Sequence, residues 1–276
     1  MTTSTPTVWS PPEMVHPRQR AWSLARAEWT KLRTVRSTMW TLVAMAIITV
    51  GIAIIAGTTI ASRWNMFSVI QRLTFDPTRI SLRGLLFSQL IIGVLGVLIM
   101  SAEYGTGTIR ATLAAVPRRP RVLVAKAAVF FVVAAVVGEV LSFSAFLIGQ
   151  SLLVSPAPHA VLSQPGVLRA VIGGGLVIAV LGQFALGLAT MIRHSAGAIT
   201  AYVGILLVVP IILQALPTSI SQPILKFMPF TISDTMVSVG PTGTSAFSPW
   251  VGFALLVAYA AASLVIGGWL LVRRDA

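Results

Sequence analysis

The chain contains no cysteine and few charges, since only 10% of its 276 residues are Asp, Glu, Lys or Arg. Without cysteine there is no disulfide, no thiolate metal site and no cysteine nucleophile, and the redox compartment stays undetermined. Hydrophobic residues make up 56% of the chain, and the mean hydropathy is +0.89. Because so few polar side chains cannot cover a soluble globule, the composition predicts an integral membrane protein.

The sequence also lacks the common catalytic and nucleotide-binding motifs. His16, His159 and His194 lie far apart, with no H-E-x-x-H pattern, and no G-x-S-x-G turn occurs. The Gly-Thr-Gly-Thr run at 105–108 is not followed by the Lys-Ser or Lys-Thr pair of a phosphate loop. We therefore expect no catalytic residue, no metal site and no cofactor bound by this chain.

Six apolar runs are long enough to cross about 30 Å of hydrocarbon, which predicts an all-α polytopic membrane protein. The third run is longer than one span needs, so we expect its first turn, near Lys126, in the interface unless the helix is strongly tilted. Pro210 predicts a kink in the fifth run. The runs cover residues 39–61, 84–102, 122–154, 167–192, 196–216 and 250–272.

The distribution of basic residues predicts the orientation. If the N-terminus is inside, fourteen of the twenty Lys and Arg residues fall on the cytoplasmic side, which favours both termini in the cytoplasm. The net charge of +13 then marks cytoplasmic loops and contacts with anionic lipids, not a nucleic-acid partner. The basic residues left outside are Arg63, Arg72, Arg79, Arg83, Arg169 and Lys226.

The polar N-terminus has two parts. Residues 1–18, rich in Thr, Ser and Pro, are expected to form a disordered tail, and residues 19–276 a single transmembrane domain. Apolar residues recur at helical spacing within 19–37, as in an amphipathic helix that lies in the headgroup layer. This helix either only anchors the chain or also contacts a cytoplasmic partner. The residues assigned to it are Trp22, Glu28, Trp29, Lys31 and Arg33.

A charged segment at 103–126 separates the second and third apolar runs and cannot lie in the bilayer core. It begins with Gly-Thr-Gly-Thr, carries Arg110 in a helical middle, stops at Pro117 and ends in a basic cluster. These features predict a short helix that lies flat at the membrane surface and is presented to a partner. The alternative is a plain positively charged cytoplasmic loop.

The helix AEWTKLRTVRSTMW at 27–40 and the 103–126 segment together resemble permease subunits of type-2 ATP-binding-cassette (ABC) exporters. In that family a Glu near the inner end of the second span precedes a Gly-Thr pair, a short helix, a Pro with a following basic residue, and a Lys that opens the third span. The six-span layout extends the resemblance from Ala21 over nearly the whole chain. The matching positions are Glu103, Gly107-Thr108, 109–116, Pro117-Arg118 and Lys126.

The resemblance implies that the short helix is a coupling helix, which docks into a groove of a separate cytoplasmic ABC ATPase subunit. ATP and Mg²⁺ would then bind the partner subunit, and a second permease, identical or related, would complete the pathway as a homodimer or heterodimer. The docking residues implied are Glu103, Gly107, Thr108, Arg110, Pro117, Arg118 and Arg119.

Polar side chains inside the apolar runs are candidates for the transport pathway or for the interior of the bundle. A glutamate in an apolar run is costly in lipid, so it should face the bundle, a water-filled cavity or a basic partner. The alternative role is only to hold helices together. Glycines at 173–175, 182 and 187 predict close helix packing. The polar candidates are Gln89, Glu139, Ser142 and Gln150.

The segment at 217–249 is moderately apolar but is interrupted by Pro223 and Pro229, so it is too broken to span. It is similar to the short re-entrant or surface helices that the family places before its last span, and as such it would form an outer lid on the path. A solvated connector is the alternative.

The sequence therefore predicts a permease subunit of an ATP-driven exporter in a bacterial plasma membrane. An ion-coupled secondary transporter would need more intramembrane acids and an internal repeat of broken helices, and a membrane scaffold would not need a coupling element. The substrate stays open among drugs, peptides and lipids, because a fold does not specify its cargo. Amphipathic small molecules or lipids are preferred.

Overall fold

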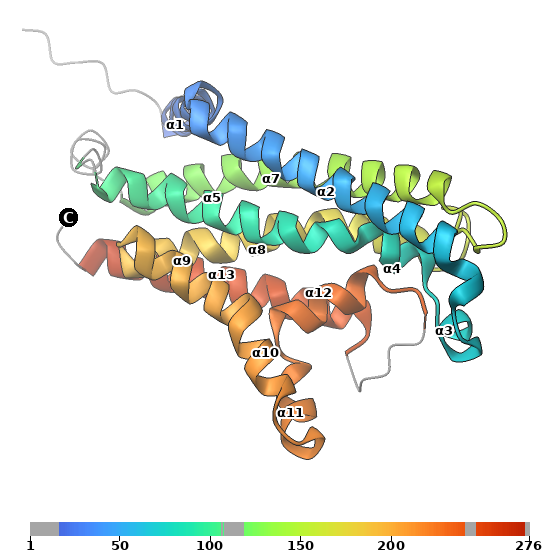
Figure 1. The fold of residues 1–276 in the computed structure, drawn as a ribbon. Helices are drawn as coiled ribbons and strands as arrows, with labels where there is room; N and C mark the ends of the chain where they lie inside the picture. The colour runs from blue at the N-terminus through green and yellow to red at the C-terminus, as the bar shows by residue number, and fades with distance from the viewer. Residues whose placement is uncertain (1–16, 106, 108–118, 241–246, 274–276) are drawn as a thin grey trace, which may run out of the picture.

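The computed structural model describes residues 17–105, 107, 119–240 and 247–273. Within these ranges every regular element is a helix (Figure 1). The elements are α1 (Pro17–Thr34), α2 (Arg36–Arg63), η1 (Trp64–Met66), α3 (Val69–Leu73), α4 (Pro77–Ser81), η2 (Leu82–Gly84), α5 (Leu85–Gly105), α7 (Arg119–Leu152), α8 (Val167–Ile192), α9 (Ser195–Val203), η3 (Gly204–Val208), α10 (Val209–Gln214), α11 (Thr218–Leu225), α12 (Pro229–Val237) and α13 (Pro249–Arg273).

Six helical segments in the described ranges are long and apolar enough to cross a membrane, which confirms the predicted number and the all-α fold class. The fourth span, Val167–Ile192, has the predicted bounds. The second begins earlier than expected, at Pro77, because α4 and η2 lead directly into α5. Helix α7 has 34 residues and is therefore about 51 Å long at 1.5 Å per residue. Its ends extend beyond the hydrocarbon layer.

Helix α8 is the central helix of the bundle. In its most apolar stretch 83% of the residues are buried, against 17% in the corresponding stretch of the span that begins at Arg36. Its glycines allow this, because a side chain at Gly175 would meet the Glu139 carboxyl of α7, and one at Gly187 would meet Ser263 of α13. The predicted close packing at these glycines is confirmed.

The fifth span contains a change of helix type instead of a simple kink. The segment η3 is a π-helix, and it lies directly before α10, whose second residue is Pro210. A proline cannot donate to the fourth preceding carbonyl and its ring clashes with that turn, so the wider π turn relieves both problems. Figure 1 shows α10 leaning away from the bundle toward α11.

The segment before the last span contains two short helices, as predicted. Helix α12 packs against α8 and α13, with Ile232 and Met236 buried, so this part is not a solvated connector. Helix α11 lies apart from the bundle in Figure 1. The role of this region as an outer lid stays a prediction.

Different helices lie at the two ends of the bundle (Figure 1). Helix α1, the last turn of α5, the first turn of α7 and the last turn of α13 lie together, and we call this the α1 end. Helices α3 and α4 lie at the opposite end, which we call the α4 end. The end of α5 and the start of α7, which flank residues 106–118 in the sequence, therefore both lie at the α1 end.

Candidate functional site

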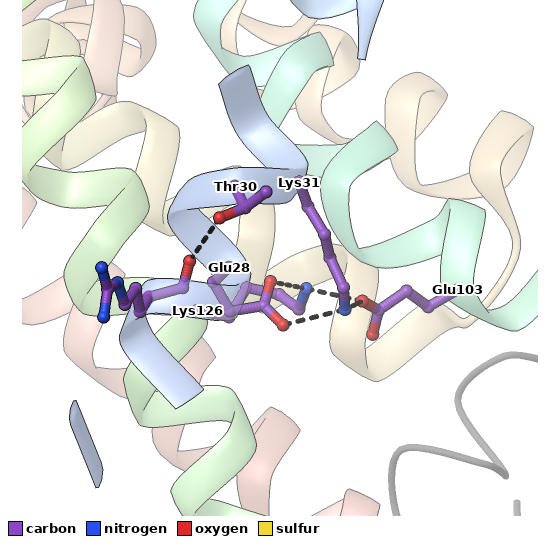
Figure 2. A network of polar contacts seen from close by, with 6 residues as sticks. Glu28, Thr30, Lys31, Glu103 and Lys126 are labelled. Atoms are coloured by element: carbon purple, nitrogen blue, oxygen red, sulfur yellow. Dashed lines mark hydrogen bonds and ion pairs between the residues drawn. The ribbon is translucent and has the colours of Figure 1, made fainter. Parts of the chain in front are cut away.

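Four charged side chains form a closed ring at the α1 end (Figure 2). The ammonium of Lys126 lies 2.6 Å from Glu28 Oε2 and 2.8 Å from Glu103 Oε1. The ammonium of Lys31 lies 2.8 Å from the same Glu103 oxygen and 3.0 Å from Glu28 Oε1. Each lysine therefore contacts both glutamates, and the two positive charges balance the two negative ones.

Three helices supply the ring. Glu28 and Lys31 are one turn apart on α1, so their side chains project from the same face. Glu103 lies in the last turn of α5, and Lys126 lies in the second turn of α7. The ring thus joins α1 to both helices that flank the segment 106–118.

The ring is largely closed to solvent. The side chains of Lys126, Glu28 and Glu103 are only 3%, 8% and 10% exposed, whereas Lys31 is 49% exposed. A buried ion pair loses hydration energy, so it adds little net stability over an apolar contact. Removing one partner is different, because it leaves a buried charge uncompensated, at a cost of roughly 3–5 kcal/mol. The ring therefore specifies one arrangement of the three helices.

Lys31 is the part of the ring that water reaches. Burial disfavours its charged form, but the hydrogen bonds that it donates to Glu103 and Glu28 and the attraction of both carboxylates outweigh this and raise the pKa of Lys31 above its ordinary value. Lys31 therefore stays protonated throughout the neutral pH range, and the ring keeps its charge balance.

A second contact ties the end of α5 to the opposite side of the bundle. The guanidinium of Arg193 lies 5.5 Å from the centroid of the Tyr104 ring, and it donates to the carbonyl of Leu270 at 3.4 Å. Arg193 follows the last residue of α8, and Leu270 lies in α13. Glu103 and Tyr104, adjacent in sequence, thus connect α5 to α1 and α7 on one side and to α8 and α13 on the other.

Only some of the predicted docking residues lie within the part of the chain that the structure describes. Gly107 is exposed, has a positive φ of 69° that favours glycine, and donates its N–H to the Tyr104 carbonyl at 3.2 Å. Arg119 is the first residue of α7. The predicted coupling helix at 109–116 lies outside the described residues, as do Thr108, Arg110, Pro117 and Arg118. Their role in docking stays a prediction.

The residues assigned to the amphipathic helix separate into two faces of α1. Trp22 and Trp29 are 72% and 48% exposed and border an apolar groove against α7. Arg33 is also exposed. Glu28 and Lys31 instead point to the ring, so this part of α1 packs on protein.

The four polar candidates inside the spans have different surroundings. Ser142 donates to the Val171 carbonyl at 2.6 Å, so it joins α7 to α8. The Gln150 amide donates to Pro77 O and Ser81 Oγ, both at 2.9 Å, and joins α7 to α4. Three side-chain oxygens are buried without a hydrogen-bond partner among the described residues: both carboxylate oxygens of Glu139 and the amide oxygen of Gln89. The structure thus brings Ser142 and Gln150 into helix contacts and leaves Glu139 and Gln89 with unused acceptors.

The sequence identified all four ring residues separately but did not predict that they meet. Glu28 and Lys31 were assigned to the membrane surface, Glu103 to docking, and Lys126 to the start of the third span. A signal was present, because the chain has only seven acidic residues, and Glu28 and Glu103 both lie near expected inner helix ends. The contact between Tyr104 and Arg193 had no comparable signal.

The helical bundle with its six spans defines a multi-pass membrane protein. A family model described as ABC-2 family transporter protein matches residues 24–210, from α1 into α10. The chain belongs to this family, so it is a permease component of an ABC transporter. A comparison with curated proteins finds no match.

Proposed function

We propose that this chain is the permease subunit of an ABC exporter in a bacterial plasma membrane. A separate ATPase subunit binds ATP and Mg²⁺ and docks at the α1 end, on the segment between α5 and α7. The observation that carries this proposal is the four-residue ring, because it joins α1 to both helices that flank the docking segment.

The ring supports a simple transmission mechanism. A displacement of the docking segment acts on the end of α5 and the start of α7 together, and the ring makes α1 follow. Tyr104 passes the same displacement to α8 and α13 through Arg193. Packed helices that have two discrete arrangements convert such a displacement into the opening or closing of a path.

A second permease completes the pathway in this proposal. Helix α8 fills the centre of the bundle, and 83% of the residues in its most apolar stretch are buried. A path for cargo therefore forms along the outside of the bundle, between this chain and a second copy or a related chain. Both dimers are compatible with the single-chain geometry.

Affinity purification of the tagged chain from its native membrane tests the proposal. We expect an ABC ATPase to co-purify and the complex to hydrolyse ATP. Arg110→Glu should abolish the association while the chain still inserts. Arg63→Glu, an exposed arginine at the opposite end of the bundle, is the matched control and should leave the association intact.

Two outcomes contradict the proposal. If no ATPase associates under any mild extraction, the chain acts without an ATP-driven partner, as a scaffold or ion-coupled transporter would. If Arg63→Glu disrupts the association as strongly as Arg110→Glu, the ATPase contact is at the α4 end or is a nonspecific charge effect.

A further inference from the structure

A cavity at the α4 end has a different character from the ring. It has a volume of about 270 Å³ and lies between the start of α5 and α12. Figure 1 shows α4 and α12 side by side at this end. The volume is just below the roughly 300 Å³ at which small-molecule pockets begin. The cavity therefore has room for a headgroup and a short length of one hydrocarbon chain, not for a large ligand.

The charges that line the cavity do not balance. Arg79 donates two hydrogen bonds to Asp234, at 2.9 and 2.8 Å, so the charges of these two residues neutralise each other. Arg83, four residues further along, also lines the cavity, and it has no ion pair or hydrogen bond with any residue that the structure describes. Asp76 does not line the cavity and forms no ion pair with Arg83, and its carboxylate oxygens accept three backbone N–H groups instead. One positive charge is therefore available to a ligand.

A buried glutamine also lines this cavity. Gln89 is only 3% exposed, and its side-chain oxygen has no hydrogen-bond partner among the described residues. A buried polar atom without a partner is costly, so this oxygen favours a ligand that carries a hydroxyl or N–H group. The rest of the lining is mainly apolar and includes Leu85, Leu86 and Phe230.

We infer that this cavity binds a single-chain amphipathic anion. The anionic group pairs with Arg83, a hydroxyl group of the headgroup donates to Gln89 Oε1, and the hydrocarbon chain packs on the leucines and Phe230. An organic cation is rejected by Arg83, and a free inorganic anion lacks the apolar contacts. The small volume selects one chain over two.

A binding assay with dodecyl phosphate in its singly protonated form, which carries both a charge and a hydroxyl group, tests this inference. The purified full chain is placed in phosphatidylcholine nanodiscs, and saturable binding of the radiolabelled probe is measured. Arg83→Ala should weaken binding about tenfold, the effect of losing one charge-assisted hydrogen bond, and Arg83→Lys should restore most of it. Arg63→Ala, which removes an exposed arginine outside the cavity, should change nothing.

Two further measurements separate the contribution of Gln89 from that of the charge and the hydrocarbon chain. Gln89→Leu should weaken binding by a few fold without lowering the melting temperature, because it removes an acceptor that has no partner. Dodecyltrimethylammonium should not compete, and inorganic phosphate should compete only weakly.

Equal binding by the Arg83→Ala and Arg63→Ala variants would overturn the inference, since the probe would then only partition into the bilayer. Equal competition by the cation would also overturn it, because the cavity would then select only for a hydrocarbon chain. The assay needs no ATPase, so its outcome is independent of whether the proposed exporter function holds.

Discussion

The two ends of helix α5 place charges in opposite settings. At the α1 end, Glu103 is buried in a ring whose four charges balance. At the α4 end, Arg79 pairs with Asp234 near the surface, with side chains that are 48% and 35% exposed, and Arg83 has no ion pair among the described residues. The same helix thus begins beside an unbalanced, open charge cluster and ends in a balanced, closed one.

This difference indicates different tasks. A buried, balanced ring tolerates no change in the relative position of its helices, because moving one charge away exposes the others to an apolar surrounding. An open cluster is hydrated, contributes little to stability and can exchange water for a ligand. This difference agrees with the two proposals above, in which the α1 end transmits force and the α4 end contacts a ligand.

The largest expected effect is at the ring. Lys126→Met leaves Glu28 and Glu103 buried with only the half-exposed Lys31 between them, so we expect a loss of roughly 3–5 kcal/mol. Thermal unfolding of the purified protein in nanodiscs measures this as a lower melting temperature. Changing all four ring residues to Gln or Met should restore most of the stability, because no unpaired charge remains. A melting temperature for Lys126→Met equal to that of Arg33→Ala, on the exposed face of α1, would refute the buried-ring account.

A substitution in the middle of α5 tests whether the two ends of this helix are mechanically connected. A side chain at Gly93 would lie 2.0 Å from Cε1 of Tyr202, whose hydroxyl donates to the Gln89 carbonyl at 2.8 Å. Gly93→Ala must displace this ring, at a cost of about 1–3 kcal/mol. Gly51→Ala in α2 has no atom within 4 Å and should be neutral or slightly stabilising. Equal melting temperatures for the two variants would show that α5 is loosely held between its ends.

Within the ring, the more buried lysine should contribute more to the stability of the protein. Lys31→Met removes a side chain that is 49% exposed, and Lys126 still contacts both glutamates, so we expect a loss of about 1 kcal/mol. The comparison with Lys126→Met in the same unfolding assay isolates the effect of burial. A larger loss for Lys31→Met than for Lys126→Met contradicts this ranking.

The smallest effect is expected at the open end. Arg79→Ala removes the pair with Asp234, and because both side chains are partly exposed the cost should be no more than about 1 kcal/mol. The backbone N–H of Arg79 still binds Asp76, so α4 keeps its N-terminal cap. Asp234→Asn should have a similarly small effect. A loss comparable to that of Lys126→Met would remove the distinction between the two ends.

Much of the fold was predictable because bilayer thickness fixes the length of apolar runs. The span at 167–192 was predicted with its observed bounds, and the two prolines at 223 and 229 correctly indicated a segment that does not span the membrane as one helix. The π segment before Pro210 was not predicted, since several local adjustments can accommodate a proline. The ring was missed for another reason: its residues lie up to 98 positions apart, and helical spacing says nothing about which helices meet.

The central claim is that α1 and the adjoining ends of α5 and α7 move as one body. Because the chain has no cysteine, Arg33→Cys and Val124→Cys place two spin labels uniquely on exposed positions of α1 and α7. Double electron–electron resonance on the ATPase-bound complex should give the same distance with and without ATP, while the distance between the Val124 labels of two permeases changes. A shift between α1 and α7 of about one helical turn, 5.4 Å, on adding ATP would contradict the claim.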